Sequence, residues 1–384
     1  MTIGIDARPL LESRGGVAEY TRHLITAMIS RAPQHEYVLY TSGRCRPSVL
    51  ESIVPTHASC QVVHVSIPNK FLNASMVFIG RPQLDRLIEM RSGRRLDCLW
   101  CPNGNFVPLS GRTPLVITFH DASFAIEASW FSRRQRLWHR LVNFPKLVGG
   151  AAAIIAVSEK TKEDLRTFFC VQSQRVTVIG LGTAEPDANS GDELVRDLPK
   201  KFILSFGAEN PRKNAECLVD AVYRMRSLYP SLRDVRLVLV QTENASLRRL
   251  KHLIRLRGLQ GFCLIRGPLS SSLRSAFISR ASLLAYPSLY EGFGLPPFEA
   301  ARFGVPSIVS SVASLPETSG DFSLLVNPYD STSVARGLGT LLLDQRVRQR
   351  AIARGRDALN SFTWDAAAAA TISVFERTQS HSRI

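Results

Sequence analysis

Long hydrophobic runs are missing from this sequence. No apolar stretch reaches the ~20 residues that a membrane-spanning helix needs. The longest candidate, LVGGAAAIIAV at residues 147–157, fits the end of a helix that leads into a buried strand. The first residues, MTIGIDARPL, have no basic leader before an apolar core and therefore do not resemble a secretory signal. These absences predict a cytoplasmic protein.

Cysteine is scarce, with seven residues scattered through 384. An odd and scattered set argues against a disulfide framework. Cys98 and Cys101 have the spacing of a redox or zinc motif, but no second cysteine pair or histidine pair follows to complete a zinc site. We therefore expect ordinary buried cysteines and no metal site.

Acidic residues are in deficit, since 32 Asp and Glu face 48 Lys and Arg, which gives a formal net charge of +16. Such an excess predicts an anionic partner, but charge alone does not distinguish nucleic acid, anionic lipid and phosphorylated substrates. The sequence has no zinc-finger spacing, helix-turn-helix signature or aromatic RNA-binding motif, and we therefore expect no nucleic-acid partner.

Part of the positive charge gathers at residues 66–149, where 12 Lys or Arg and 5 Asp or Glu leave a net charge of +7. Four arginines recur there at helical spacing beside large apolar residues: Arg133, Arg134, Arg136 and Arg140, with Trp130, Phe131, Leu137 and Trp138. A basic helix with interleaved aromatics is typical of a surface that docks on an anionic membrane. The pattern also fits a solvated helix whose aromatic side chains pack into the core, and both interpretations stay open.

Short apolar runs alternate with helix-period stretches along the chain. The first half has such runs at residues 2–6, 37–40, 61–65, 96–100, 115–119, 153–157 and 176–179, with a helix expected at 17–30. Residues 182–199, rich in Gly, Pro, Asp and Ser, predict a linker. Beyond it we expect strands at 202–206, 235–241, 262–265 and 282–286 and helices at 215–228, 247–257 and 271–280.

Strands that are apolar on both faces and alternate with helices predict parallel sheets covered on two sides. The fold class is therefore α/β, with two Rossmann-like domains that face each other across a cleft. Ligands in such sheets bind at the carboxyl ends of the strands.

The most informative stretch is PSLYEGFGLPPFEA at residues 287–300. It follows an apolar strand, passes through Gly292 and Gly294, and enters a helix at two prolines, which suit a first turn. The N–H groups of a helix N-terminus form an anion site that suits a diphosphate. Glu291 and Glu299, the latter expected on the first turn, flank this site and could accept hydrogen bonds from sugar hydroxyls. Helix stability alone would also explain an acid near the positive end of the dipole.

This stretch resembles the paired-glutamate motif of family 4 glycosyltransferases, which are retaining enzymes of the GT-B fold. Further resemblances follow in family order: RGGVAEYT at residues 14–21, VITFHD at 116–121, AVSE at 156–159, FG at 206–207 with PRKN at 211–214, and FTW at 362–364. They cover nearly the whole chain. Their combination is similar to that of bacterial mannosyltransferases of surface-polysaccharide assembly.

The resemblance implies a donor site for a nucleotide sugar. Arg212 and Lys213 would neutralise its diphosphate, and Glu299 would accept hydrogen bonds from the ribose. Two backbone segments would approach the phosphates and the sugar: Gly15 and Gly16, and the loop of Gly292, Phe293, Gly294 and Leu295. The chain departs from many relatives at Ala208, where they carry arginine, and at residues 241–242, where they commonly place a glycine.

The resemblance also implies the catalytic residues, which would be His120, Asp121, Lys213 and Glu291. His120 would bind the donor sugar near the reacting carbon, with Asp121 orienting it. Glu291 would hold a hydroxyl of the transferred sugar, and Lys213 would stabilise the leaving diphosphate. The sequence has no Asp-x-Asp, the usual metal clamp of the other large glycosyltransferase fold. We therefore expect a metal-independent enzyme whose nucleotide sugar is a substrate and which needs no cofactor.

The resemblance favours transfer of mannose from GDP-mannose, with retention, onto a glycan or a lipid-diphosphate-linked saccharide. Transfer of rhamnose or another hexose is the alternative within the family. A nucleotide-sugar epimerase of the same fold is the alternative class, although it would need several acids in the cleft and would lack the paired glutamates. A lipid-linked acceptor would place the enzyme at the inner face of the cytoplasmic membrane.

The domain limits follow from the linker and from the family pattern. Residues 1–187 would form the acceptor-binding domain and residues 188–363 the donor-binding domain. The final helix, at about residues 364–384, would cross back onto the first domain.

Overall fold

The computed structural model describes residues 1–11, 15–44, 50, 53, 59–183, 195, 197–241 and 247–381. The chain divides into two compact units, residues 1–182 with 363–384 and residues 183–362. The predicted boundary between residues 187 and 188, and most of the predicted linker, lie outside the described residues.

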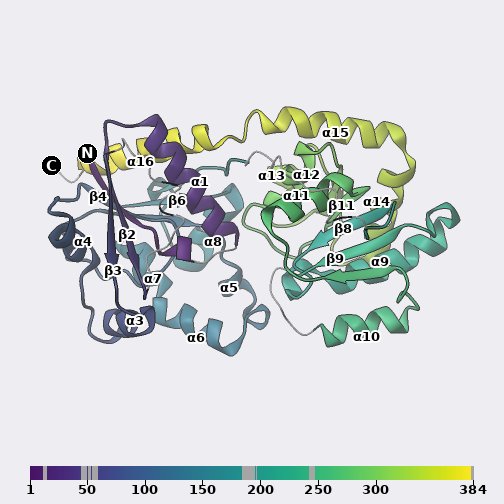
Figure 1. Ribbon diagram of the computed structural model, residues 1–384, viewed down its shortest axis with the longest axis horizontal. Coiled ribbons are helices and arrows are strands. Elements are labelled where there is room, and N and C mark those ends of the chain that lie inside the picture. Colours follow the sequence, from purple (N-terminus) through teal and green to yellow (C-terminus); the bar gives the residue numbers. More distant parts are fainter. Residues whose placement is uncertain are drawn as a thin grey trace. The chain divides into compact units, whose positions relative to one another are not determined.

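The first unit is built on a parallel sheet with the order β3-β2-β1-β4-β5-β6-β7 (Figure 1). Its strands are β1 (Thr2–Asp6), β2 (Glu36–Ser42), β3 (Cys60–Val65), β4 (Cys98–Cys101), β5 (Leu115–Phe119), β6 (Ala153–Ala156) and β7 (Val176–Val178). Its helices are α1 (Gly16–Arg31), α3 (Asn69–Phe78), α4 (Leu84–Ser92), α5 (Ser123–Ile126), α6 (Arg133–Val142), α7 (Phe144–Gly150), α8 (Glu159–Phe169) and α16 (Trp364–His381).

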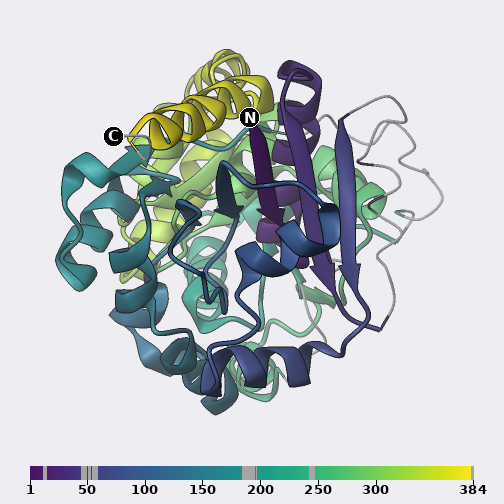
Figure 2. The ribbon, with the colours of Figure 1, turned by 90° about the vertical axis from the view of Figure 1, so that its left-hand side faces the viewer.

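Helix α16 belongs to the first unit although the whole second unit precedes it in the sequence. It lies beside α1 and near the N-terminus (Figures 1 and 2). Arg31 of α1 forms an ion pair with Asp365, with a nitrogen–oxygen distance of 2.5 Å. Phe375 is fully buried, and its ring lies 5.9 Å from that of Trp100 on β4. The helix thus covers one face of the sheet.

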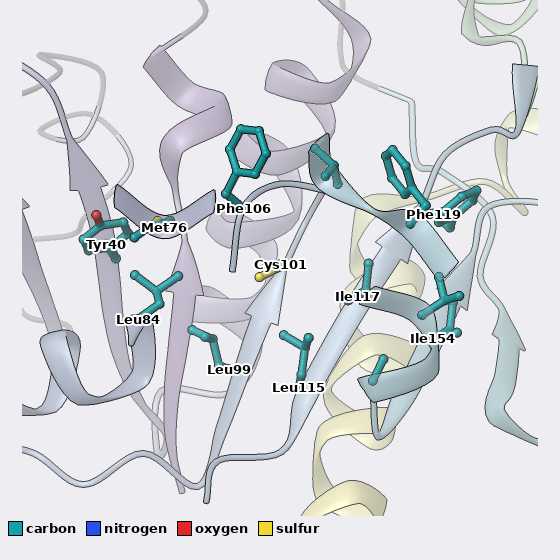
Figure 3. Packing of buried hydrophobic residues seen from close by; sticks show 14 of the residues in the cluster. Tyr40, Met76, Leu84, Leu99, Cys101, Phe106, Leu115, Ile117, Phe119 and Ile154 are labelled. Carbon is teal, nitrogen blue, oxygen red and sulfur yellow. The ribbon is translucent and has the colours of Figure 1, made fainter. Parts of the chain in front are cut away.

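The opposite face of this sheet carries an apolar layer. Leu99, Leu115 and Ile117 project into it from adjacent strands, and Phe106 and Phe119 close its upper part (Figure 3). The sheet is therefore buried on both faces, which explains why its strands have continuous apolar runs instead of alternating ones.

The second unit has a parallel sheet with the order β10-β9-β8-β11-β12-β13. Its strands are β8 (Phe202–Phe206), β9 (Arg236–Val240), β10 (Cys263–Arg266), β11 (Leu283–Tyr286), β12 (Ser307–Ser310) and β13 (Leu324–Val326). Its helices are α9 (Ala215–Leu228), α10 (Arg248–Leu256), α11 (Ser271–Arg280), α12 (Leu295–Arg302), α13 (Leu315–Ser319), α14 (Ser331–Leu343) and α15 (Gln345–Leu359).

Alternate residues of β9 show that this sheet, too, is covered on both sides. Leu237 and Leu239 belong to one apolar cluster, whereas Val238 and Val240 belong to the other. Successive side chains of a strand point to opposite faces, so each cluster fills one side. The α/β fold class and the two Rossmann-like domains predicted from the sequence are confirmed.

Several predicted elements have the bounds found in the structure: β1, β5, β8, α9 and α11. The strand predicted at residues 96–100 begins two residues later, at Cys98. Among the described residues, no helix combines the length and the apolar character needed to cross a membrane.

Candidate functional site

The second unit has a switch point in its strand order at β8, which pairs with β9 on one side and with β11 on the other. Ligands of open parallel sheets bind outside the carboxyl ends of the strands at such a point. Strand β8 ends at Phe206 and leads to residues 207–214, whereas β11 ends at Tyr286 and leads to the glycine-rich loop. The two predicted donor-site motifs therefore follow neighbouring strands.

Arg212, Lys213 and Glu291 meet at this edge. Nζ of Lys213 donates to Oε1 of Glu291 at 2.5 Å, and Nη1 of Arg212 donates to Oε2 at 3.0 Å. The hydroxyl of Tyr286 lies 2.6 Å from the same Nζ. Glu291 is only 6% exposed, so this carboxylate holds two cations in a largely buried site.

The residues around the two cations fix their backbone. A 3₁₀ turn spans Pro211–Lys213, and the side chain of Asn210 accepts a hydrogen bond from the Arg212 N–H. Asn214 donates to the carbonyl oxygens of Pro287 and Pro328. Gly207 adopts a φ of +77°, and a Cβ there would lie 2.8 Å from Cγ of Lys213, so the lysine stem needs a glycine beneath it.

Burial and the ion pairs act in opposite directions on the carboxyl group of this cluster. Burial opposes the charge of Glu291, but the positive charges of Arg212 and Lys213 outweigh it and lower the pKa of this carboxyl from 4.5 to about 2. Burial and the charge of Glu291 raise the pKa of Tyr286 well above its ordinary value. The carboxylate is therefore ionised and the phenol neutral at physiological pH.

Hydrogen bonds from α13 and its N-cap residue hold the glycine-rich loop in place. Ser314 donates to the carbonyl oxygen of Glu291 at 2.9 Å, and Thr318 donates to that of Phe293 at 2.8 Å. Gly294 adopts a φ of +94°, and a Cβ there would lie 2.5 Å from Cδ2 of Leu315. The loop thus has a fixed shape that only glycine permits at this position.

Helix α12 begins at Leu295, one residue before the predicted start, and Glu299 is its fifth residue. The expectation that Glu299 lies on the first turn is therefore wrong. The two prolines that follow Leu295 have no N–H groups. An anion at this end of the helix would thus depend on the N–H groups of residues 292–295 more than on the helix itself.

Glu299 forms an ion pair with Arg274 of α11, with a shortest nitrogen–oxygen distance of 2.5 Å. The guanidinium carbon of Arg274 lies 3.8 Å from the ring centroid of Phe206. Sequence reasoning missed Arg274 because no local motif marks it, and only the packing of α11 brings it to the site. It also missed Tyr286, which ends a predicted strand.

His120 and Asp121 follow β5 in the first unit. Nε2 of His120 lies 2.8 Å from the carbonyl oxygen of Pro102, and its ring packs edge-on against Tyr20 of α1, with centroids 4.7 Å apart. Burial lowers the pKa of this imidazole. Because a carbonyl can only accept, Nε2 carries the proton and Nδ1 of the neutral ring remains an acceptor.

Asp121 lies two residues before the short helix α5, whose N-cap is Ala122. Its Oδ1 accepts hydrogen bonds from the Ser123 N–H at 3.0 Å and from the Ser123 hydroxyl at 2.5 Å. A local role in positioning this turn is therefore visible, and the predicted role in orienting His120 stays a prediction.

Gly15 and Gly16 form the N-terminal end of α1. Gly15 is the N-cap with a φ of +130°, and a Cβ on either glycine would meet no described heavy atom within 4 Å. Among the described residues, none therefore crowds the backbone at the start of this helix. Arg14, the first residue of the predicted glycine loop, lies outside the described residues.

The cysteine pair at β4 is buried, as predicted. Cys98 and Cys101 are fully buried, and burial raises the pKa of the Cys98 thiol to about 12. Neither is a reactive thiolate at physiological pH. Within the described ranges, no group of three or more His, Cys, Asp or Glu side chains could hold a metal ion.

Two family profiles match the chain. The profile "Glycosyltransferase Family 4" matches residues 14–184, and "Glycosyl transferases group 1" matches residues 189–358. The chain belongs to the glycosyltransferase families. The resemblance to family 4 is thereby confirmed.

Curated relatives of this glycosyltransferase family member include several mannosyltransferases. The MMP alpha-(1->4)-mannosyltransferase of Mycolicibacterium hassiacum is 31% identical over 69% of this chain and 65% of its own length. The serotype-specific mannosyltransferase WbdA of Escherichia coli is 29% identical over 64% of this chain. The aligned part spans only 30% of WbdA. The O-antigen chain mannosyltransferase B of E. coli is 27% identical over 68% of this chain and 70% of its own length.

Solved structures share the fold across the whole chain. Sucrose-phosphate synthase from Thermosynechococcus elongatus superposes with a TM-score of 0.74 at 21% identity and covers 98% of both chains. Anabaena HepE, solved in complex with UDP and glucose, superposes with a TM-score of 0.66 at 19% identity and covers 97% of this chain and 99% of its own. These likenesses confirm the GT-B class of fold.

Proposed function

We propose that this protein transfers mannose from GDP-mannose, with retention of the anomeric configuration, onto a glycan or a lipid-diphosphate-linked saccharide of bacterial surface-polysaccharide synthesis. The cluster of Arg212, Lys213 and Glu291 at the switch point carries the proposal. Two cations beside a glycine-rich loop suit a diphosphate, and a carboxylate between them suits a sugar hydroxyl. The mannosyltransferases among the relatives favour mannose as the transferred sugar.

The reaction would break the bond between the anomeric carbon and the diphosphate oxygen and form one to the acceptor oxygen on the same face of the sugar. The acceptor hydroxyl would lose its proton to the departing diphosphate. Lys213, Arg212 and the N–H groups of residues 292–295 would stabilise the negative charge that develops there. Such a mechanism needs no metal ion, so we propose that the enzyme is metal-independent.

His120 would act through its unprotonated Nδ1, which can accept a hydrogen bond from a hydroxyl of the donor sugar. Glu299 would accept hydrogen bonds from the ribose hydroxyls, for which it would have to share its contacts with Arg274. Gly15 and Gly16 would let the backbone of the first unit approach the phosphates.

We further propose that the first unit docks on the anionic inner face of the cytoplasmic membrane through α3 and α6. Both helices lie at the lower edge of this unit in the two ribbon views (Figures 1 and 2). The four arginines of α6 are exposed, and Leu137 beside them is 56% exposed. Phe71 and Phe78 of α3 are 73% and 79% exposed. Protruding apolar side chains among basic ones suit an anionic bilayer.

A nucleotide screen tests the donor assignment. Thermal unfolding is followed with GDP, UDP and dTDP, because a ligand that binds only the folded protein raises its stability by mass action. We expect GDP to raise Tm most, and GDP-mannose to yield an α-linked mannosyl product identified by NMR. A larger rise in Tm with dTDP or UDP would instead support a rhamnosyltransferase or another hexosyltransferase. Conversion of the nucleotide sugar without an acceptor would favour the epimerase.

A further inference from the structure

Tyr20 of α1 is a buried tyrosine, only 2% exposed, and the proposed transfer does not use it. Three aromatic rings of the same unit meet its ring edge-on: those of His120, Trp364 and Trp100, at centroid distances of 4.7, 5.9 and 6.3 Å. Edge-to-face packing is a favourable geometry for aromatic pairs. Tyr20 therefore packs against both the predicted catalytic imidazole and the first residue of α16.

A hydrogen bond to the sheet holds the far end of the Tyr20 side chain. Its hydroxyl lies 3.1 Å from the hydroxyl of Thr118 on β5. The same Thr118 oxygen accepts the indole N–H of Trp100 on β4 at 3.0 Å. A buried hydroxyl that gives up its partner loses free energy, so the ring cannot easily turn away from this position. Tyr20 is therefore a fixed support for the side chains that contact it.

Trp364 at the start of α16 is itself held against α1. Its indole stacks on the ring of His23, with centroids 5.2 Å apart and an angle of 12° between the planes. Gly182 makes room for it, since a Cβ there would lie 2.3 Å from the backbone nitrogen of Trp364. This tryptophan ends the FTW stretch that resembles the family pattern. It thus limits the movement of the Tyr20 ring that it contacts.

The imidazole of His120 needs such a support. The contact of Nε2 with the Pro102 carbonyl oxygen holds one ring atom, but the last torsion of a histidine is broad, so the plane of the ring also depends on packing. Tyr20 meets this plane at an angle of 87°. Burial lowers the pKa of His120, whereas the nearby charge of Asp121 acts in the opposite direction. The cover over the ring therefore affects both its orientation and its protonation.

We infer that Tyr20 is a positioning residue for His120, and that Trp364 supports Tyr20 in this role. The ring of Tyr20 sets the plane of the imidazole and keeps water from it, so that Nδ1 remains an acceptor. The consequence for sugar transfer rests on the proposed function, in which this nitrogen accepts a hydrogen bond from the donor sugar. The positioning itself is a property of the ligand-free protein, and it can be measured there.

Histidine NMR on the full, ligand-free chain tests the positioning. Long-range ¹H–¹⁵N spectra, recorded over a range of pH, report the tautomer and the pKa of each of the eight histidines, and His120→Gln identifies the signals of His120. The wild type should show a proton on Nε2 and a pKa below the ordinary 6.5. Tyr20→Leu should raise this pKa and mix the two tautomers. Tyr20→Phe keeps the ring and should retain the wild-type signals of His120.

Steady-state kinetics with GDP-mannose show what the positioning does for transfer. Tyr20→Leu should lower kcat by roughly 10–100-fold, the scale of a misplaced catalytic group, and should change KM for the donor less. The loss should be larger at about pH 6 than at about pH 8, because a protonated imidazole cannot accept a hydrogen bond. Trp364→Leu should change kcat and the His120 signals in the same direction but by less.

Tyr37→Leu is the matched control, because it removes another buried tyrosine of the first unit, whose hydroxyl donates to two backbone carbonyls near the end of α1. It should lower Tm and leave the His120 signals unchanged. The inference is overturned if Tyr20→Leu leaves the tautomer and pKa of His120 as in the wild type, or if Tyr37→Leu changes them equally. Wild-type signals in Trp364→Leu would overturn the part assigned to Trp364. Altered His120 signals with a wild-type kcat in Tyr20→Leu would contradict the proposed role of His120 and still support its positioning.

Discussion

Lys213 and Glu291 constrain each other through a contact of 2.5 Å, and the Tyr286 hydroxyl lies 2.6 Å from the same ammonium nitrogen. The ammonium group is therefore placed at one point beside the glycine-rich loop. Such a fixed charge can stabilise a leaving diphosphate without first having to reorganise.

Lys213→Ala should lower kcat by on the order of 100-fold, the scale of losing one charge-stabilising group. Glu299→Ala should instead weaken nucleotide binding, since its predicted contact is to the ribose. Steady-state kinetics and isothermal titration with GDP separate the two effects. Lys251→Ala, which removes an exposed lysine of α10, serves as the control. Wild-type kinetics and affinity in both site variants would disprove the donor-site assignment.

Glu291 should also shape the pH dependence of stability. Its pKa falls from 4.5 in the unfolded chain to about 2 in the folded protein. A carboxylate whose pKa is lowered by folding stabilises the protein above the unfolded value and loses this contribution as pH falls toward the folded value. A shift of this size corresponds to ~3 kcal/mol.

Urea unfolding at roughly pH 5 and pH 2.5 should therefore show a larger loss of stability for the wild type than for Glu291→Gln. Glu163→Gln, which changes an exposed carboxylate paired with Lys160, is the control and should behave as the wild type does. Equal losses in all three proteins would show that Glu291 is not held ionised by its two cations.

At the scale of elements, the loop before α12 takes its shape from Gly294 and from the hydroxyls of α13. Gly294→Ala should reduce the free energy of unfolding by about 1–3 kcal/mol, because alanine would be strained at this φ and would contact Leu315. Gly261→Ala is the matched control, since no heavy atom of the described residues beyond its chain neighbours lies within 4 Å of a Cβ there. It should change stability by under ~0.5 kcal/mol. Chemical denaturation measures both. Equal effects would mean that the loop tolerates other shapes.

Substitutions in helices α3 and α6 test the proposed docking on an anionic membrane. Arg133→Glu combined with Arg134→Glu should weaken flotation with anionic vesicles, since each basic residue near such a surface contributes about 1 kcal/mol. Binding should also fade as added salt shortens the Debye length from ~10 Å at 0.1 M to ~3 Å at 1 M. Phe78→Ser should further weaken binding to the vesicles, because this side chain is 79% exposed and so could contact the bilayer.

The control for flotation reverses two exposed arginines of α15, Arg346→Glu with Arg350→Glu, which change the net charge equally. Equal recovery of the wild type on neutral and anionic vesicles would leave α6 as a solvated helix. Trp138 already fits that simpler interpretation in part, because its ring packs against the core.

The sequence predicted those elements best whose pattern is local. Strands β5 and β8 are continuous apolar runs, and α9 and α11 have clear helical periods, so their bounds were correct. Arg212, Lys213 and Glu291 were identifiable because each lies in a short motif. Arg274 reaches Glu299 only through the packing of α11 on α12, and no local pattern encodes such a contact.

A cavity of about 280 Å³ in the first unit illustrates the same limit at a larger scale. Its side chains come from residues near 8, 69–73, 103–105 and 138, and they meet only when the first sheet is assembled. A single asparagine in a loop has no recognisable pattern. The sequence shows the basic arginines of α6, but for Trp138 among them it predicts only a membrane-facing or core side chain and gives no sign that it lines a cavity.

At the scale of the whole molecule, the first unit needs α16. A chain that ends at residue 362 would expose the sheet face that Phe375 covers and would lose the contact of the Gln379 amide with Asp97 at 2.7 Å. Removing one buried phenylalanine already costs roughly 3–5 kcal/mol. We expect the truncated chain to lose the thermal transition of the first unit.

A fragment of residues 183–362 should unfold cooperatively by itself, because all the residues that form its two apolar clusters lie within it. Calorimetry of both fragments checks this difference. Cooperative unfolding of the first unit without α16 would show that the helix is dispensable.

The position of α16 at the end of the sequence also determines when the first unit can finish folding during protein synthesis. A ribosome that adds ~5–20 residues per second needs on the order of 10–40 s to make the second unit, and α16 is translated only after it. During that time, the part of the sheet face that Phe375 covers beside Trp100 has left the ribosome without α16. Domains usually finish folding in the order in which they are made. Here the unit that is begun first must be completed last, so its nascent form presents chaperones with an apolar surface that the finished protein hides.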